Sequence, residues 1–323
     1  MNIRWFASAG LFMLLSACSM PAITDSSNVV AGAGATSEKL TVLDHHVIPR
    51  DAEIGGLKIT ELSGLAWDED EQLLYAISDK GRVYHFQLNI ENDLIKSVKP
   101  VFGAKLRDVK GKQLKKNQRD SEGLTVWNAS NGKKGDTQLV ISLEGKPRIV
   151  RFTPQGRAIA DIAVPKPLRN HRKLRASNHG LESVAYHNKY GFITAPEESL
   201  KGQPKNLHTV YAAKKQWSFL AYPAENSSIT AMDMMPGTNN LLVMERAWSG
   251  VLNPMVISLR RVNLDACSDK GECKAENLKV FSSSFSVDNF EGMTPIGNNR
   301  YLIVSDDGKH DLLRTLLTLF KVE

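Results

Sequence analysis

The sequence has 323 residues, of which 42% are hydrophobic and 24% charged, and 41 lysines and arginines against 35 acidic residues leave a net charge of +6. At about 150 residues per domain, this length allows two domains or one large all-β unit. The composition excludes a mainly disordered chain. No apolar run of about 18 residues follows the first twenty positions, which excludes a polytopic membrane protein. The modest charge argues against a uniformly basic nucleic-acid-binding protein.

The N-terminus has the order of features of a secreted bacterial lipoprotein. A positive start, Met1–Arg4, precedes an apolar stretch over 5–15 that is too short to span a membrane. The stretch ends in Leu-Ser-Ala-Cys18, which resembles a lipobox, so residues 1–18 are interpreted as a lipoprotein signal peptide with Cys18 lipidated. Ser19 stands where Asp would favour the inner membrane, which implies an outer-membrane anchor facing the periplasm. The alternative is a plain secretory signal with a chance cysteine.

Residues 19–39 are rich in Ser, Ala and Gly and are typical of a flexible tether. The rest of the chain, 40–323, is interpreted as a single domain. Its two cysteines, Cys267 and Cys273, are separated by five residues. An oxidising periplasm favours a disulfide between them. A zinc site is the weaker alternative, because no third cysteine or nearby histidine accompanies the pair.

A pair of strand motifs recurs along the domain. The first motif is a small-residue turn that leads into a strand, with anchors spaced by 59, 60, 49 and 60 residues at Ser63, Glu122, Glu182, Ala231 and Glu291. The second motif follows after 14 to 22 residues and is an apolar strand that ends in an acid, at Asp79, Glu144, Glu197, Glu245 and Asp306. Further β-rich stretches follow each pair.

Four short strands per unit, repeated radially, indicate an all-β fold, a β-propeller. The motif count gives five blades, and residues 40–49 would add the N-terminal strand that closes the ring. A sixth blade would have to lie in 100–120 or 166–180, which lack the motif. A pair of β-sandwiches is the rival fold, but a period of about 60 residues argues against it.

Both motif anchors of a propeller blade would lie on one face, which gathers the acids there. Glu122, Glu182 and Glu291 would lie near the channel mouth, with the second set of acids and Asp307 around them. Such carboxylates repel one another and suit a Ca²⁺ ion, which takes about 6–8 oxygen ligands, better than Zn²⁺. For the outer acids, we favour the alternative that each caps a turn or pairs with a neighbouring base.

The basic residues concentrate in two segments. Residues 105–119 and 166–175 hold twelve lysines and arginines and one acid, and we expect both segments to overhang the carboxylate face. They would attract an anionic substrate such as a phosphate ester. Alternatives are a solvated charge run or contact with anionic lipid or lipopolysaccharide phosphate. Nucleic acid is not expected, because no aromatic residue is interleaved and the signal is periplasmic.

No serine-hydrolase elbow, zinc-protease motif or phosphate-binding P-loop is present in the sequence. His171 and His179 flank Glu182, and His179 is the candidate general acid.

Three repeats carry closely similar motifs, Asp120-Ser-Glu-Gly-Leu124, Gly180-Leu-Glu-Ser183 and Asn289-Phe-Glu-Gly-Met293, the last followed by Leu302-Ile-Val-Ser-Asp-Asp307. On these motifs the chain resembles the phytase-like family, described as having "esterase-like activity of phytase", over most of 55–320. It departs at Gly308, where Asn is expected, and at Ala231-Met-Asp233, which lacks the Glu. The resemblance implies a propeller and Ca²⁺-dependent phosphoester hydrolysis.

The sequence therefore predicts a phosphoester or related ester hydrolase that is a monomer and acts on an anionic small-molecule or envelope substrate. The predicted metal ligands are Glu122, Glu182, Glu291 and Asp306, and the predicted catalytic residues are Glu122, Glu182 and His179. The predicted substrate-binding residues are Arg119, Lys146, Arg172 and Arg246. The alternative is a non-catalytic propeller that binds an envelope ligand or a protein partner.

Overall fold

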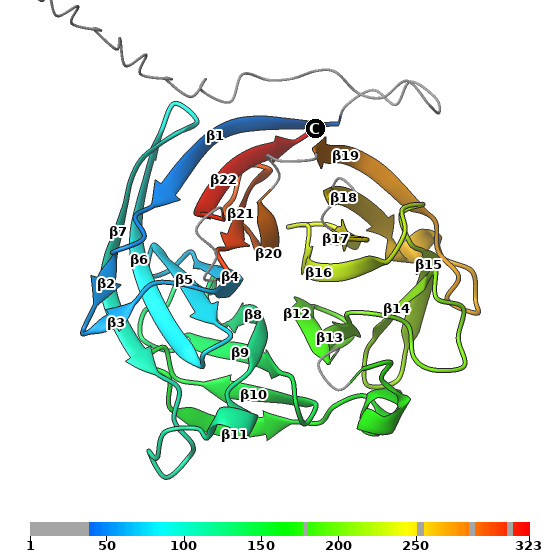
Figure 1. The fold of residues 1–323 in the computed structure, drawn as a ribbon, viewed down its shortest axis with the longest axis horizontal. Coiled ribbons are helices and arrows are strands. Elements are labelled where there is room, and N and C mark those ends of the chain that lie inside the picture. The colour runs from blue at the N-terminus through cyan, green and yellow to red at the C-terminus, as the bar shows by residue number, and fades with distance from the viewer. Residues whose placement is uncertain (1–38, 177–179, 251–254, 284–287, 309–312) are drawn as a thin grey trace, which may run out of the picture. The chain divides into compact units, whose positions relative to one another are not determined.

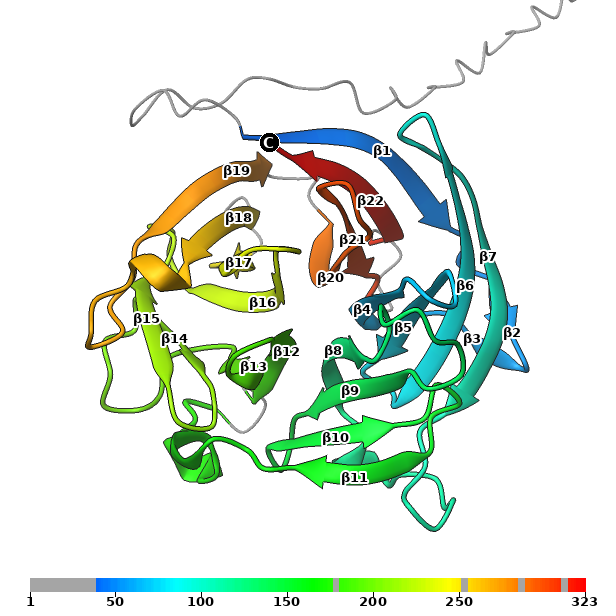
Figure 2. The same ribbon diagram turned by 180° about the vertical axis from the view of Figure 1, so that it is seen from behind.

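The computed structural model describes residues 39–176, 180–250, 255–283, 288–308 and 313–323. These described residues form one compact unit. Its strands form five four-stranded antiparallel sheets around a common axis, viewed from its two sides in Figures 1 and 2. The fold is a five-bladed β-propeller, as the motif count predicts.

Each blade runs outward from an innermost strand at the axis. Blades 1 to 3 consist of β4 (Leu62–Asp68), β5 (Leu73–Ser78), β6 (Arg82–Glu91) and β7 (Leu94–Lys105); β8 (Ser121–Trp127), β9 (Gln138–Leu143), β10 (Arg148–Phe152) and β11 (Ala158–Ile162); and β12 (Leu181–His187), β13 (Gly191–Pro196), β14 (Leu207–Tyr211) and β15 (Gln216–Leu220). Blades 4 and 5 consist of β16 (Ser227–Met234), β17 (Asn240–Ala247), β18 (Met255–Asn263) and β19 (Ala275–Ser283); and β20 (Asn289–Pro295), β21 (Arg300–Asp306), β22 (Thr315–Val322) and β1 (Leu40–Ile48).

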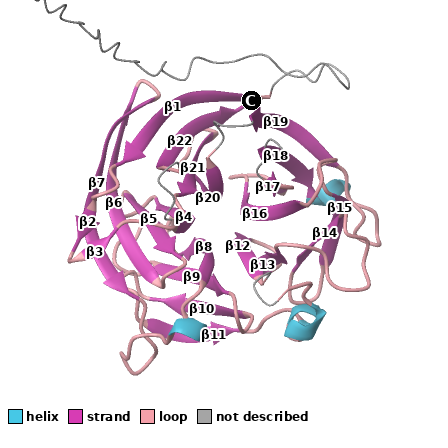
Figure 3. Ribbon diagram, in the orientation of Figure 1, coloured by secondary structure: helices cyan, strands magenta, loops and turns pink. Residues whose placement is uncertain are grey.

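The described residues outside the blades form little regular structure. A short hairpin pairs β2 (Glu53–Ile54) with β3 (Leu57–Lys58), and four single-turn 3₁₀ helices lie in connections (Figure 3), at Lys116–Gln118, Lys166–Leu168, His171–Lys173 and Leu264–Ala266. No helix within the described ranges has both the length and the apolar character needed to cross a membrane.

The N-terminal strand closes the ring. β1 pairs antiparallel with β22, from Leu40 opposite Val322 to Ile48 opposite Thr315. Blade 5 thus takes three strands from the C-terminus and its outermost strand from the N-terminus, as predicted. No sixth blade exists in the two segments considered: 100–120 holds the end of β7 and a 3₁₀ turn, and the described part of 166–180 holds two such turns.

Apolar side chains fill the spaces between neighbouring blades. The second strand of a blade is buried on both faces, as in Leu73–Ser78 and Gln138–Leu143, because it is covered by a blade on each side. Five buried clusters match the five blade interfaces, one of which joins Leu242 and Leu259 of blade 4 to Tyr301 and Phe320 of blade 5. This arrangement explains why the sequence shows near-continuous apolar runs there and no clean alternation.

Every innermost strand contains a β-bulge near its start. In blades 1, 3, 4 and 5 the pairing with the second strand skips one residue, at Ser63, Glu182, Thr230 and Glu291. In blade 2 the pairing passes from Ser121 to Leu124, so Glu122 and Gly123 together lie opposite Ser142. The sequence alignment of blade 4 was wrong by one position, because it matched Ala231, not Thr230, to the glutamates. Bulges re-aim side chains, and here each one precedes the closest approach of the strands to the axis.

The residue after the bulge is small in all five blades, and the blades meet there. A Cβ atom on Gly123 would lie 2.6 Å from the Cα of Ser183 and 2.7 Å from the backbone nitrogen of Val184. A Cβ atom on Gly292 would lie 3.0 Å from the Cα of Gly64. Backbone-to-backbone contact at these positions therefore requires residues with little or no side chain.

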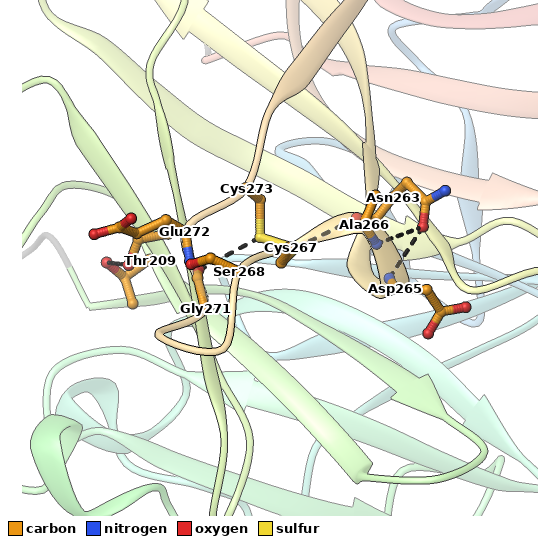
Figure 4. The surroundings of a disulfide bond; sticks show 10 residues. Thr209, Asn263, Asp265, Ala266, Cys267, Ser268, Gly271, Glu272 and Cys273 are labelled. Carbon is orange, nitrogen blue, oxygen red and sulfur yellow. Dashed lines mark hydrogen bonds between the residues drawn. A yellow bond between two sulfur atoms is a disulfide. The ribbon is translucent and has the colours of Figure 1, made fainter.

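The predicted disulfide between Cys267 and Cys273 is present, with Cα atoms 4.4 Å apart (Figure 4). It closes the turn between β18 and β19. The closed turn extends blade 3, because Ser218 of β15 donates its N–H to Gly271 at 2.7 Å and accepts the N–H of Cys273 at 2.8 Å. The disulfide thus stabilises a turn of blade 4 that is hydrogen-bonded to the outermost strand of blade 3.

We predict that Gly123→Ala lowers the free energy of unfolding by about 3 kcal/mol, because the new Cβ would meet backbone atoms that cannot move independently. Gly132→Ala is the matched control. Gly132 has φ +78°, and a Cβ atom added there would meet no other atom within 4 Å, so only the left-handed backbone costs about 1 kcal/mol. Urea unfolding would measure both, and equal losses would contradict the close packing at the axis.

Candidate functional site

Carboxylates gather at the end of the axis where the bulges lie. We call this set the acidic mouth; it consists of Asp120, Glu122, Glu144, Glu182, Glu291 and Asp306. Glu122, Glu182 and Glu291 are the bulged residues of β8, β12 and β20. Glu144 follows β9, and Asp306 ends β21. The strand directions predicted from the sequence therefore bring the four predicted metal ligands to one face.

Three members of the acidic mouth converge most closely. Asp120, Glu122 and Glu144 each offer a carboxylate oxygen within 4.8 Å of the other two. The backbone fixes two of them, because the N–H of Glu144 donates to the Asp120 carbonyl at 2.8 Å. The Glu144 carboxylate also accepts the N–H of Gly180 at 2.7 Å. This geometry suits a cation with oxygen ligands.

Glu122 and Glu182 have no hydrogen-bond donor among the described residues, although the charge of Arg246 partly opposes the rise in the pKa of Glu182. Neither carboxylate accepts a hydrogen bond or forms an ion pair with any other described residue. Burial raises the pKa of Glu122 well above its ordinary value, and the charges of Glu182 and Glu291 raise it further. Burial likewise raises the pKa of Glu182, and Glu197 and Glu144 add to the effect. Both groups would be stabilised as carboxylates by a bound cation.

Glu291 differs because a base contacts it. Arg246 donates to Glu291 at 2.8 Å, to Asn289 at 2.5 Å and to Glu197 at 3.4 Å. Asn289 also donates to the same Glu291 oxygen, Oε1, at 2.8 Å. Burial still raises the pKa of Glu291, although Arg246 opposes that shift. The other oxygen of Glu291 has no donor among the described residues and is available to a ligand.

The paired aspartates after β21 have different environments. Burial raises the pKa of Asp306 to about 7, and the charge of Glu291 contributes to the shift. Asp307 instead accepts hydrogen bonds from the Thr60 hydroxyl at 2.6 Å and the N–H of Glu61 at 2.9 Å. Asp307 therefore links blade 5 to the segment before blade 1, which is the turn-capping role favoured for the outer acids.

Glu245 also belongs to a structural network. It is buried and accepts hydrogen bonds from Arg260 at 2.6 Å and from the N–H of Tyr222 at 2.6 Å. His208 lies 3.4 Å away, and it and Arg260 lower the pKa of Glu245 to about 2 despite the burial. The network joins blades 3 and 4. Pairing with a base, predicted for the outer acids, holds here, but the base is on β18.

The predicted substrate-binding residues are not gathered at one point. Arg246 lies in the acidic mouth, and Arg119 packs against Gly81 beside it. Lys146 and Arg172 are exposed on connections. A further base, Lys80, contacts Asp79 at 2.5 Å and Glu61 at 2.9 Å.

Part of the first basic segment lies away from the mouth. The N–H of Arg107 donates to Gly156 in the turn between β10 and β11, and Arg157 donates back to the carbonyl of Val109 at 2.9 Å. The segment reaches the mouth only at its end, near Arg119. The expectation that the whole segment overhangs the carboxylates was therefore wrong for its first half.

Two of the residues predicted from the sequence, His179 and Cys18, lie outside the described residues, so their roles stay predictions. Asp120 is the member of the acidic mouth that the sequence reasoning did not single out. It directly precedes β8 and stands two residues before Glu122 in the motif Asp120-Ser-Glu122.

Comparison with protein-family models gives a match over most of the chain. The model of the phytase-like family, described as "Esterase-like activity of phytase", matches residues 58–309. No curated protein matches the sequence.

Three solved structures match this chain at low identity and with TM-scores below 0.5. The WD40 repeats of RRP9 are 9% identical with a TM-score of 0.46, over 89% of this chain and 98% of that chain. The PQQ-bound aldose sugar dehydrogenase from Streptomyces coelicolor is 12% identical with a TM-score of 0.45, over 90% and 100%. The Dos1 propeller is 9% identical with a TM-score of 0.36, over 80% and 68%.

We predict that Asp306→Asn gains stability relative to wild type as the pH rises. The raised pKa means that the folded protein holds the Asp306 proton more tightly than the unfolded chain does. The wild-type protein therefore has its full free energy of unfolding below pH 4, and it loses part of this stability as the pH rises to about 7. In EDTA, the unfolding free energy of the variant minus that of wild type should increase by about 3 kcal/mol between pH 4.5 and 8. Urea unfolding measures this difference, and a constant difference would contradict the assignment.

Proposed function

The chain belongs to the phytase-like family, and we propose that it hydrolyses phosphate esters or related anionic esters at the acidic mouth with bound Ca²⁺. The observation that carries the proposal is the pair Glu122 and Glu182. Both are carboxylates at the axis with raised pKa values and without a donor among the described residues. Burying such groups together is costly unless a cation joins them.

The donor set fits a hard cation. Asp120, Glu122 and Glu144 would hold the ion, and Glu182, Glu291 and Asp306 add oxygens to the same mouth. All are carboxylate oxygens, which Ca²⁺ prefers, and no cysteine or histidine of the described residues joins the cluster. The bases that contact the surrounding acids, Lys80 and Arg246, are fewer than the acids.

The chain's own residues supply the remaining chemistry. When bound, Ca²⁺ would polarise an ester oxygen and lower the pKa of an attacking water. Glu122 would hold the ion, whereas Glu182 is not one of the three closest ligands and would accept a proton from the attacking water. Arg246 is fixed by three hydrogen bonds and has further N–H groups that can bind an anionic ester. Arg119, Lys146 and Arg172 would draw the anion towards the mouth.

We predict that purified protein releases phosphate from a panel of phosphate monoesters only with Ca²⁺ present. Glu122→Gln and Glu182→Gln should each lower kcat/KM at least about 100-fold and weaken Ca²⁺ binding, because each removes a charged oxygen ligand. Phosphate release and calorimetric titration with Ca²⁺ are the measurements.

Asp161→Asn is the control, because Asp161 lies on the outer strand β11, is paired with Arg148 and changes the net charge equally. Ca²⁺ binding without turnover of any ester would reject the hydrolase and support the binding propeller. Absence of Ca²⁺ binding would reject the metal site as well.

We also propose that the chain is an outer-membrane lipoprotein anchored through Cys18 and facing the periplasm. The support is the order of positive start, apolar stretch and lipobox-like Leu-Ser-Ala-Cys18 in the sequence. The proposal places the acidic mouth in a compartment where disulfides form, which agrees with the Cys267–Cys273 bond.

We predict that the full chain expressed in a Gram-negative host incorporates labelled fatty acid and fractionates with the outer membrane. Cys18→Ser should abolish the labelling. Cys267→Ser is the control, since it removes a cysteine without touching the signal and should leave the labelling intact. Labelling that persists in Cys18→Ser would contradict the anchor.

A further inference from the structure

A second concave site lies at the end of the axis opposite the acidic mouth. It is a cavity of about 220 Å³ to which all five innermost strands contribute residues near their ends. The turn from β16 to β17 forms one wall. The innermost strands begin at the acidic mouth and end at this cavity, so the two sites are separated by the small residues that close the axis. We call it the distal cavity.

The chemistry of the distal cavity differs from that of the acidic mouth. Its lining includes the aromatic rings of Trp67 and Tyr186 and the thioether of Met234, and it contains one acid, Asp233. No lysine or arginine is among its described lining residues. Trp67 is held in place by a hydrogen bond from its indole N–H to Glu69 at 2.7 Å.

Asp233 is poorly compensated. Its Oδ1 accepts the N–H of Met234 at 2.8 Å, and its other oxygen has no donor within the described part of the chain. Burial raises the pKa of Asp233 to about 7, an effect that the Met234 hydrogen bond only partly offsets. A carboxylate in this state gains most from a ligand that brings both a positive charge and an N–H donor.

The other titratable groups near Asp233 do not supply that charge. Burial lowers the pKa of His187, which lines the cavity from β12, so its ring is neutral at pH 7. Tyr186 lines the same wall. Burial raises the pKa of Tyr301 on β21 to about 12, and the charge of Asp233 contributes to this shift. Tyr301 is therefore neutral at pH 7 as well. Lys189 and Asp265 act on His187 and are not among the residues lining the cavity.

We propose that the distal cavity binds a small organic cation, with an ammonium N–H donating to the free oxygen of Asp233 and the apolar part packed against Trp67, Tyr186 and Met234. Cations are attracted to aromatic faces, and a thioether adapts to an apolar ligand, so the lining and the carboxylate favour the same ligand class. The cavity is smaller than the ~300–1,000 Å³ of drug-sized sites, so the ligand is of about ten non-hydrogen atoms. This site is separate from the proposed hydrolysis.

Benzylammonium chloride is a suitable probe, with benzyl alcohol and benzoate as neutral and anionic analogues of matching shape. Calorimetric titration of the full chain should give a Kd on the order of 0.1–1 mM for benzylammonium. The two analogues should bind at least about 10-fold more weakly. Asp233→Asn should weaken benzylammonium at least about 10-fold, since it removes the charge and keeps the shape.

Two control variants separate this site from the acidic mouth. Glu122→Gln and Asp161→Asn should leave the benzylammonium Kd within twofold of wild type, since neither residue lines the distal cavity. Loss of binding in Glu122→Gln would place the cation at the acidic mouth and overturn the proposal. If wild-type protein releases no phosphate from any ester but still binds benzylammonium, the hydrolase alone is rejected.

The titration of Asp233 provides a test that needs no variant. Benzylammonium should bind wild-type protein several-fold more tightly at pH 8 than at pH 6, because the carboxyl group ionises between them. A Kd independent of pH would overturn the proposal even if Asp233→Asn did not fold. So would equal affinity for benzyl alcohol, or no binding of benzylammonium at ~10 mM.

Discussion

The close approach of the five innermost strands determines both the fold and the candidate site. Gly64, Gly123, Ser183, Ala231 and Gly292 occupy the level at which neighbouring strands touch. Side chains of ordinary size would hold the blades apart there, and a ring of five could not close. The bulge one residue earlier turns each strand into this contact, which explains why the motif reads as an acid followed by a small residue in three of the five blades.

The same constraint concentrates negative charge. Once the strands are this close, the side chains of the bulged residues must share the space at the end of the axis. Glu122, Glu182 and Glu291 are therefore brought together by packing, against their mutual repulsion, and the apolar interfaces between the blades supply the compensating stability. Arg246 forms an ion pair with Glu291 and also partly opposes the rise in the pKa of Glu182, but it does not cancel that rise. Functional sites commonly show such local conflict between charge and fold.

The sequence predicted the features that depend on the length of the repeat and on the direction of its strands. The five units, the closing strand at 40–48, the disulfide and the placement of the glutamates on one face follow from repeat length and strand direction. Blade 4 was misaligned by one residue because its bulged residue, Thr230, carries no acid to mark it. The register of a bulge is set by pairing with the next strand, which a single sequence does not display.

The sequence did not predict which base each acid contacts, or which residues hold the first basic segment. Glu245 reads like the remaining acids that follow a second strand, yet it binds Arg260, fifteen positions later on the neighbouring strand. The first basic segment, 105–119, connects the outermost strand of blade 1 to the innermost strand of blade 2. Its first half is held by the turn between β10 and β11 and not by the carboxylates. In both cases the partner depends on how the strands twist around the axis.

Blade 4 shows how the two ends of the axis come to prefer different cations. At the acidic mouth it contributes Thr230 where three other blades contribute glutamate, and at the distal cavity it contributes the single acid, Asp233. Several converging carboxylates repel one another and are satisfied only by a compact ion of higher charge. One carboxylate among aromatic and thioether groups cannot replace the hydration shell of such an ion, whereas an organic cation needs one hydrogen-bond acceptor and an apolar wall. The number of acids at each end thus selects the ligand class.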